Sequence, residues 1–156
     1  MPQEIWQQQE IVRWTKILLD SYKDLFGKEL IERSKDALKD SENLFHADFV
    51  VFSHNTNPDP LYNYANKKGL QLWEMTWEEL VKTPSRTTTE PLLREERERL
   101  LKQTAEKGFV CNFKGIRISK TGKKYYIKDI TLWNLRDEKG LFCGQAATFS
   151  QWEKIE

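Results

Sequence analysis

The last third of the chain alternates apolar and polar residues with a period of two, and this pattern limits the fold most strongly. Three segments carry it: FVCNFKGIRIS from Phe109, KKYYIKDITLWNL from Lys123 and LFCGQAATFSQW from Leu141. The connections KTGK and RDEKG are typical of tight turns. Residues 49–52 (FVVF) predict a buried strand, and residues 61–64 predict a short one beside it. We therefore expect five strands in one antiparallel sheet.

Helical patterns fill the first two thirds. Residues 4–26 carry apolar side chains three and four positions apart, which predicts a helix ending at Gly27. Residues 34–44 predict a second, highly charged helix. The stretch 61–80, LYNYANKKGLQLWEMTWEEL, predicts a short strand, then a helix capped by Asn66 and another opened by Thr76.

A longer helix should begin at Glu90 and Pro91 and end at Gly108, with an apolar stripe of Leu92, Leu93, Leu100 and Leu101. The order of elements indicates an α+β fold with helices gathered on one face of the sheet. The broad apolar stripe of the first helix must also be covered. Either the outer face of the sheet or a second copy of the chain would cover it.

The composition excludes some classes of protein. The 25 Lys and Arg residues nearly cancel the 24 Asp and Glu residues, which argues against a protein that holds nucleic acid through phosphate contacts. The sequence contains neither a secretory signal nor the run of about 20 apolar residues that a membrane helix needs. With two cysteines and no C-x-x-C motif, we expect a cytoplasmic protein with free thiols, although the sequence leaves a disulfide open.

Particular residues resemble a PAS domain. YANKKGLQLWEMTWEEL, from Tyr64, is similar to the PAS signature of two short capped helices. FVVFSHNTNPDPLYNYAN, LWEMTWEEL, TPSRTTTEPLLREER and GIRISKTGKKYYIKD more specifically resemble the MEKHLA domain, in its standalone bacterial form. The resemblance runs from about residue 18 to 152. It implies a PAS-like domain over residues 41–156, preceded by an N-terminal helical cap or dimerisation segment over residues 1–40.

The resemblance raises three questions about cofactors. Flavin photosensors of the PAS class carry a reactive cysteine where this chain has Ser85, so the sequence argues against adduct photochemistry. Haem-binding members use a histidine of the long helix, and residues 91–107 contain none. His54 and Asp59 lack an evident third metal ligand at a sensible spacing.

A polar cluster follows the buried strand and is the first candidate site. His54, Asp59, Asn63 and Asn66 surround the start of the predicted cavity wall, where the polar end of a ligand would lie. Loop and capping hydrogen bonds explain the same residues without a ligand.

Six other residues complete the candidate set. Trp73 and Trp133 would form a wall of the pocket or simply belong to the core. Arg86 could bind a phosphate or bridge a carboxylate such as Glu90. Cys111, Phe113 and Arg117 would line the sheet side.

The direction of Arg117 depends on strand geometry. A bulge near Gly115 would turn Arg117 outward, whereas an unbroken strand would point it the same way as Cys111. An inward Arg117 would favour an anionic ligand. The small residues Gly144, Ala146 and Ala147 on the last strand leave space that a helix or a ligand must fill.

These patterns favour a non-catalytic sensory module that binds an unidentified small molecule and dimerises through its N-terminal helix or contacts a protein partner. One alternative is a small α+β enzyme that uses His54 and Asp59 as an acid–base pair. Another is a pure protein-interaction module, suggested by the basic hairpin of residues 114–128. We interpret those lysines as a solvated edge rather than a nucleic-acid surface.

Overall fold

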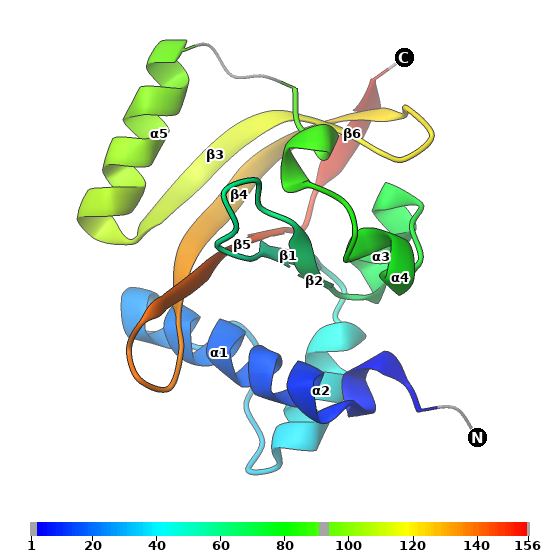
Figure 1. Ribbon diagram of the computed structural model, residues 1–156, viewed down its shortest axis with the longest axis vertical. Helices are drawn as coiled ribbons and strands as arrows, with labels where there is room; N and C mark the ends of the chain where they lie inside the picture. The colour runs from blue at the N-terminus through cyan, green and yellow to red at the C-terminus, as the bar shows by residue number, and fades with distance from the viewer. Residues whose placement is uncertain (1–2, 91–93, 156) are drawn as a thin grey trace.

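The computed structural model describes residues 3–90 and 94–155 of the 156-residue chain (Figure 1). The described helices are η1 (Ile5–Gln7), α1 (Gln9–Phe26), α2 (Ala37–Phe45), α3 (Lys67–Trp73), α4 (Trp77–Leu80), η2 (Ser85–Thr88) and α5 (Arg94–Lys107). The described strands are β1 (Val50–His54), β2 (Tyr62–Ala65), β3 (Phe109–Ile118), β4 (Lys124–Arg136), β5 (Phe142–Phe149) and β6 (Trp152–Ile155).

The strands form one antiparallel sheet in the order β2-β1-β5-β4-β3. A sixth strand, β6, extends the predicted set of five. It pairs with residues 124–127 of β4, whereas β5 pairs with residues 131–136, so β5 and β6 follow one another along the same side of β4. The strand conformation is interrupted between them, at Ser150 and Gln151. The α+β layout itself is confirmed.

Side chains on the two faces of the sheet form two separate cores. The inner face carries Phe52, Ile130 and Phe149, and Trp73 of α3 and Leu100 of α5 pack against it. The outer face carries Val51, Tyr64, Trp133 and Leu135, which pack against Leu18 and Leu19 of α1. Figure 1 shows α1 and α2 on one side of the sheet and α3, α4 and α5 on the other.

The N-terminal helix therefore covers its own sheet. Its apolar stripe is buried, with Leu18 and Leu19 fully inaccessible to solvent. The predicted helix over residues 4–26 is interrupted at Gln8, whose backbone is extended. As expected, α1 ends at Gly27, which takes the left-handed conformation with φ of 70°.

The local signals near the cavity are also confirmed. Thr76 opens α4 with a capping box, in which Glu79 N–H donates to Thr76 Oγ1 and Thr76 N–H donates to Glu79 Oε1. Helix α5 ends before Gly108, as predicted. The expected start of that helix at Pro91, with Leu92 and Leu93, lies outside the described residues.

Candidate ligand-binding cavity

A cavity of about 610 Å³ lies between the inner face of the sheet, α5 and the segment around η2. The floor is largely apolar and comes from β1, β3, β4 and β5. Leu100 and Leu101 contribute from α5, and the exposed Arg86 lies at the rim. A cavity of this size and lining fits a small organic molecule.

One wall of the cavity is an aromatic group held by a chain of hydrogen bonds. Phe52 stacks on Trp73 with ring centroids 4.6 Å apart. Trp73 Nε1–H donates to Tyr62 OH over 3.2 Å, and Tyr62 OH lies 2.5 Å from Thr88 Oγ1. Because Thr88 Oγ1 donates its proton to Ser85 O, the Tyr62 hydroxyl must donate to Thr88. Burial raises the pKa of Tyr62, so this phenol stays neutral.

The structure resolves the direction of Arg117, which lines the cavity. Asn112 and Asp129 have positive φ values of 57° and 56°, and the pairing of β3 with β4 shifts on either side of Phe113. Beyond this irregularity, Phe113 and Arg117 both line the cavity, with Gly115 between them in the alternating pattern of a strand. The irregularity therefore does not turn Arg117 outward.

The guanidinium of Arg117 lies over its own strand. Nη1–H donates to Ile116 O over 3.2 Å, and Cζ is 5.8 Å from the ring centroid of Phe113, within cation–π range. A Cβ at Gly115 would lie only 2.8 Å from Nη1, so the missing side chain makes room for the guanidinium. Burial lowers the pKa of Arg117, and the nearby Tyr62 opposes that shift only in part.

The other charged groups at the cavity are already paired. Glu90 Oε1 accepts from Lys124 Nζ over 2.9 Å. Arg86 donates two hydrogen bonds to the carboxylate of Asp59, of 3.0 and 3.2 Å. The expectation that Arg86 bridges a carboxylate is thus met, but the partner is Asp59 and not Glu90. No ion pair involves Arg117 within residues 3–90 and 94–155.

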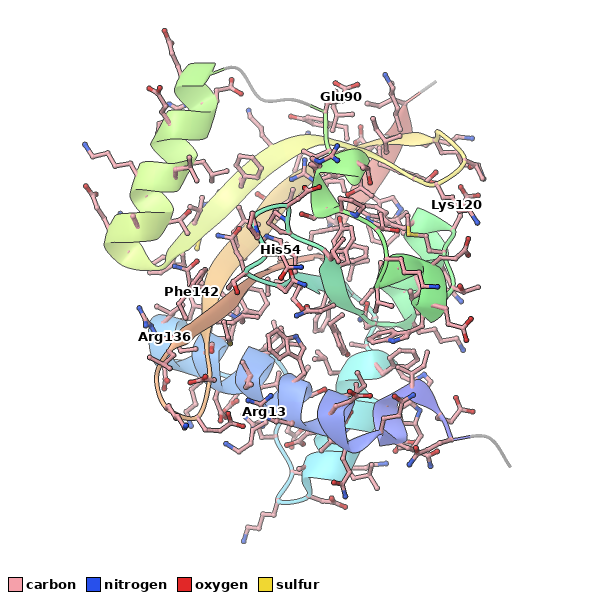
Figure 2. The ribbon with its side chains drawn as sticks, viewed as in Figure 1. Arg13, His54, Glu90, Lys120, Arg136 and Phe142 are labelled. Carbon is pink, nitrogen blue, oxygen red and sulfur yellow. The ribbon has the colours of Figure 1, made fainter. Side chains whose placement is uncertain are left out.

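His54 and Asp59 do not form the acid–base pair that the enzyme alternative needs. His54 lines the cavity at the end of β1, in the centre of Figure 2, and its Nδ1 lies 3.0 Å from Asn55 O. A carbonyl oxygen only accepts, so Nδ1 carries a proton and donates to Asn55 O. Both carboxylate oxygens of Asp59 are bound to Arg86 instead.

Asn66 has a structural position away from the cavity. It is fully buried, and its Oδ1 accepts from Gly69 N at the start of α3 and from Val51 N of β1. Its Nδ2 donates to Phe49 O over 2.8 Å and to Leu44 O over 3.2 Å. Asn66 is thus the predicted helix cap and also joins α2, β1 and α3.

Asn63 faces α1 and does not line the cavity. Its Oδ1 accepts from Ser53 Oγ over 2.6 Å, and Ser53 Oγ in turn accepts from Trp14 Nε1 over 2.9 Å. The polar cluster expected from the sequence is therefore not one site, since His54 alone among its four members lines the cavity.

The remaining candidates divide between the two faces. Trp73 and Phe113 line the cavity as expected. Trp133 does not, because it is fully buried on the outer face, where Nε1 donates to Leu18 O over 3.2 Å. Cys111 is exposed and does not line the cavity either, since the chain changes phase at Asn112.

The small residues of β5 meet three different neighbours. A Cβ at Gly144 would lie 2.5 Å from the carbonyl oxygen of His54, so β1 fills that space. Ala146 belongs to the outer core beneath α1. Ala147 lies with the inner core and lines the cavity. The sequence predicted that a helix or a ligand fills the space beside these small residues. In the structure, β1 fills it at Gly144, α1 covers it at Ala146, and the cavity lies beside Ala147.

The basic hairpin is partly neutralised by acidic residues. Lys120, Lys123 and Lys124 form ion pairs with Glu79, Glu74 and Glu90, respectively. The hydroxyls of Thr121 and Ser119 also donate to Glu74, and these bonds with Lys123 lower the pKa of Glu74 to about 2. Lys120 and Lys123 therefore link the β3–β4 turn to the end of α3 and to α4, and Lys124 links β4 to Glu90.

The described residues offer neither a cluster of metal ligands nor a membrane-spanning helix. No three His, Cys, Asp or Glu side chains of residues 3–90 and 94–155 gather in a way that would hold a metal ion. Across the same ranges, no helix has the length and apolar character to cross a membrane.

Sequence reasoning missed several cavity residues. Tyr62 pairs with His54 across β1 and β2, so the strand register would have placed it on the cavity side. Thr89 also lines the cavity but gave no local signal, because the segment around η2 reaches the cavity only through tertiary packing.

Solved structures share this arrangement at low identity. A light-oxygen-voltage domain studied with a flavin analogue aligns over 74% of this chain and 84% of its own, with 17% identity and a TM-score of 0.55. An RNA-binding light-oxygen-voltage receptor aligns over 82% of this chain and 35% of its own, with 16% identity and a TM-score of 0.62. A PAS domain from Colwellia psychrerythraea aligns over 77% and 98%, with 14% identity and a TM-score of 0.60.

The sheet order and these similarities define the class: the chain has the fold of PAS and light-oxygen-voltage domains. No curated protein matches the chain by sequence. The MEKHLA domain model matches residues 12–154, and the chain belongs to the MEKHLA domain family.

Proposed function

We propose that this domain binds a small organic molecule in the 610 Å³ cavity and passes on the occupancy of that cavity to a partner, without catalysis. The cavity is the observation that carries the proposal. It combines a mostly apolar lining with a few fixed polar groups, which is the usual composition of a ligand site.

The hydrogen bonds on the outer face support a route to α1. Along β1, Phe52 and His54 line the cavity, while Ser53 between them accepts from Trp14 of α1. A ligand that displaces Phe52 or His54 would move the backbone that positions Ser53. Since packed elements shift as units, α1 would respond to that movement.

We propose that the domain signals through self-association or through contact with a protein partner. The apolar stripe of α1 supports the sheet, so a dimer through this helix would use its opposite, charged side. Arg13, which Figure 2 labels, lies on that side and pairs with Glu138 of the β4–β5 turn over 2.7 Å. A contact there would act on α1 and on the sheet together.

The thiol–flavin adduct of light-oxygen-voltage photosensors does not fit this cavity. Ser85 lies on η2 at the cavity wall, and the chain's two thiols lie elsewhere. Cys111 is exposed, and Cys143 packs against the outer core. A hydroxyl cannot replace a thiol in that reaction, so the proposal includes no photochemical step.

Native mass spectrometry of the purified chain tests the ligand proposal, together with a variant that fills the cavity. Ala147→Phe places a ring in the cavity, whereas Ala105→Phe adds the same ring at an exposed site on α5. We expect a co-purifying small molecule, or an added neutral probe such as N-phenyl-1-naphthylamine, to be retained by the wild type and the Ala105 variant. Equal retention by the folded Ala147 variant would overturn the proposal.

A further inference from the structure

We propose that the ligand of this cavity is an organic anion, with a carboxylate-like group bound by Arg117 and an apolar body lying on the sheet. This inference rests on the proposed function and specifies its ligand class. The first observation is the charge balance of the side chains that line the cavity. Of the charged side chains at the cavity, Glu90 and Arg86 are neutralised by Lys124 and Asp59, and Arg117 has no ion pair within the described ranges.

Partial burial makes that lone cation costly. A guanidinium partly removed from water without a counter-ion loses hydration that one hydrogen bond to Ile116 O does not replace. The lowered pKa of Arg117 has the same cause. Tyr62 offers no compensating charge, because its phenol is neutral and its proton is already donated to Thr88.

The geometry leaves the guanidinium ready to bind an anion. The Arg117 N–H groups other than the Nη1–H bound to Ile116 O have no acceptor within residues 3–90 and 94–155. Gly115 and the Phe113 ring form the surface on which the guanidinium rests. A planar fork held in this way suits the two oxygens of a carboxylate or a sulfonate.

The rest of the cavity selects for an apolar body. Phe52, Ile130, Leu132 and Phe149 line its floor, and Leu100 lines it from α5. A volume of about 610 Å³ is far larger than an inorganic anion requires. The combination therefore points to an amphipathic organic anion.

A matched pair of fluorescent probes tests the inference on the full chain. 1-Anilinonaphthalene-8-sulfonate carries the same rings as N-phenyl-1-naphthylamine but adds a sulfonate. We expect the wild type to bind the anionic probe at least about 10-fold more tightly, since a charged hydrogen bond contributes about 1.5–3 kcal/mol. Arg117→Met, which keeps an apolar stem, should remove this preference and change binding of the neutral probe by less than about twofold.

Two further variants keep the test decisive. Arg117→Lys retains a cation without the fork and should give an intermediate preference, and Gly115→Ala should weaken only the anionic probe. Equal binding of both probes by the wild type, with no effect of the Arg117 variants, would overturn the anion inference and leave the proposed function standing. Failure of the wild type to bind either probe would overturn both.

Discussion

Trp14 donates its indole N–H to Ser53 Oγ over 2.9 Å, and this bond joins α1 to β1 one residue before the strand ends. Ser53 Oγ donates onward to Asn63 Oδ1 in β2 over 2.6 Å. Ser53 is almost fully buried, so all three polar groups depend on one another. The helix that covers the outer face is therefore tied to the strand whose neighbouring side chains line the cavity.

Replacement of this hydroxyl should destabilise the protein. Ser53→Ala leaves Trp14 Nε1 and Asn63 Oδ1 without their partner, and we expect a loss of about 1–3 kcal/mol in the free energy of unfolding. Chemical denaturation would measure it. In a double-mutant cycle with Trp14→Phe, the two losses should not add, because the substitutions remove the same bond. Additive losses would show that Ser53 and Trp14 act independently.

Gly144→Ala should be more damaging than its small size suggests. The new Cβ would lie 2.5 Å from the backbone oxygen of His54, and a backbone atom cannot rotate away. We expect a loss of about 1–3 kcal/mol from overpacking. Gly122→Ala is the control for backbone conformation alone, since φ is +90° there and a Cβ would meet nothing within 4 Å. Wild-type stability for the Gly144 variant would contradict the strand contact.

Asn66→Ala should cost more than the loss of an ordinary helix cap. The side chain makes four hydrogen bonds, three of them buried, and their partners would remain without compensation, so we expect a loss above about 3 kcal/mol. Thr76→Ala removes an exposed cap and should cost about 1 kcal/mol. Urea midpoints of the two variants would separate these effects. A similar midpoint for both would mean that Asn66 only caps α3.

Asp40 should make the stability depend on acid pH. Burial alone would raise the pKa of this carboxyl, but bonds from Ser34 N and Arg33 outweigh burial and hold the pKa below its ordinary value. The resulting stability is fully present above the unfolded pKa of about 3.9 and is lost as the pH falls through the folded value.

The Asp40→Asn variant should therefore lose about 1–3 kcal/mol at pH 7 and change less than the wild type between pH 5 and 3. Thermal melting across that range would measure the difference. Asp36→Asn changes a carboxylate that caps α2 through Leu38 N but does not pair with Arg33, so it controls for net charge. Parallel pH curves for the wild type and the Asp40 variant would contradict this assignment.

Removal of residues 1–26 should leave the domain unable to fold in soluble form. Deletion of α1 would expose Val51, Tyr64 and Trp133 of the outer core, together with Leu135. Such an apolar face promotes aggregation. Soluble expression and circular dichroism would test this, and a folded, monomeric fragment of residues 27–156 would contradict it. The predicted boundary at residue 40 falls within α2 (Ala37–Phe45), and the division into an N-terminal cap and a PAS-like domain stays a prediction.

Signals that act within a few residues could be predicted from the sequence. The caps at Asn66 and Thr76 and the ends at Gly27 and Gly108 follow from side-chain and backbone geometry over one turn. The last strands of the sheet likewise follow from the two-residue period and from the turn residues between them. The end of β5 before Ser150 could not be predicted, because the alternation of apolar and polar residues continues through it.

Contacts between distant segments could not be predicted in the same way. The partner of Arg86 is Asp59, 27 positions away, because the loop before β2 folds back against η2. The direction of Arg117 depends on the left-handed residues Asn112 and Asp129 and on the register shifts between β3 and β4 around Phe113. Asn and Asp tolerate the left-handed conformation, so each residue type is compatible with an irregular strand. The sequence does not indicate, however, that both residues adopt this conformation in neighbouring strands.

The division of the core by the sheet also separates the tryptophans. Trp73 lies on the cavity side, and Trp133 lies on the side that α1 covers. The fluorescence of each indole therefore reports on one side of the sheet. A molecule bound in the cavity would alter the emission of Trp73 directly, and it would alter that of Trp133 only if the strands between the two indoles move. Single Trp→Phe replacements at these positions would let one titration distinguish filling of the cavity from its transmission through the sheet.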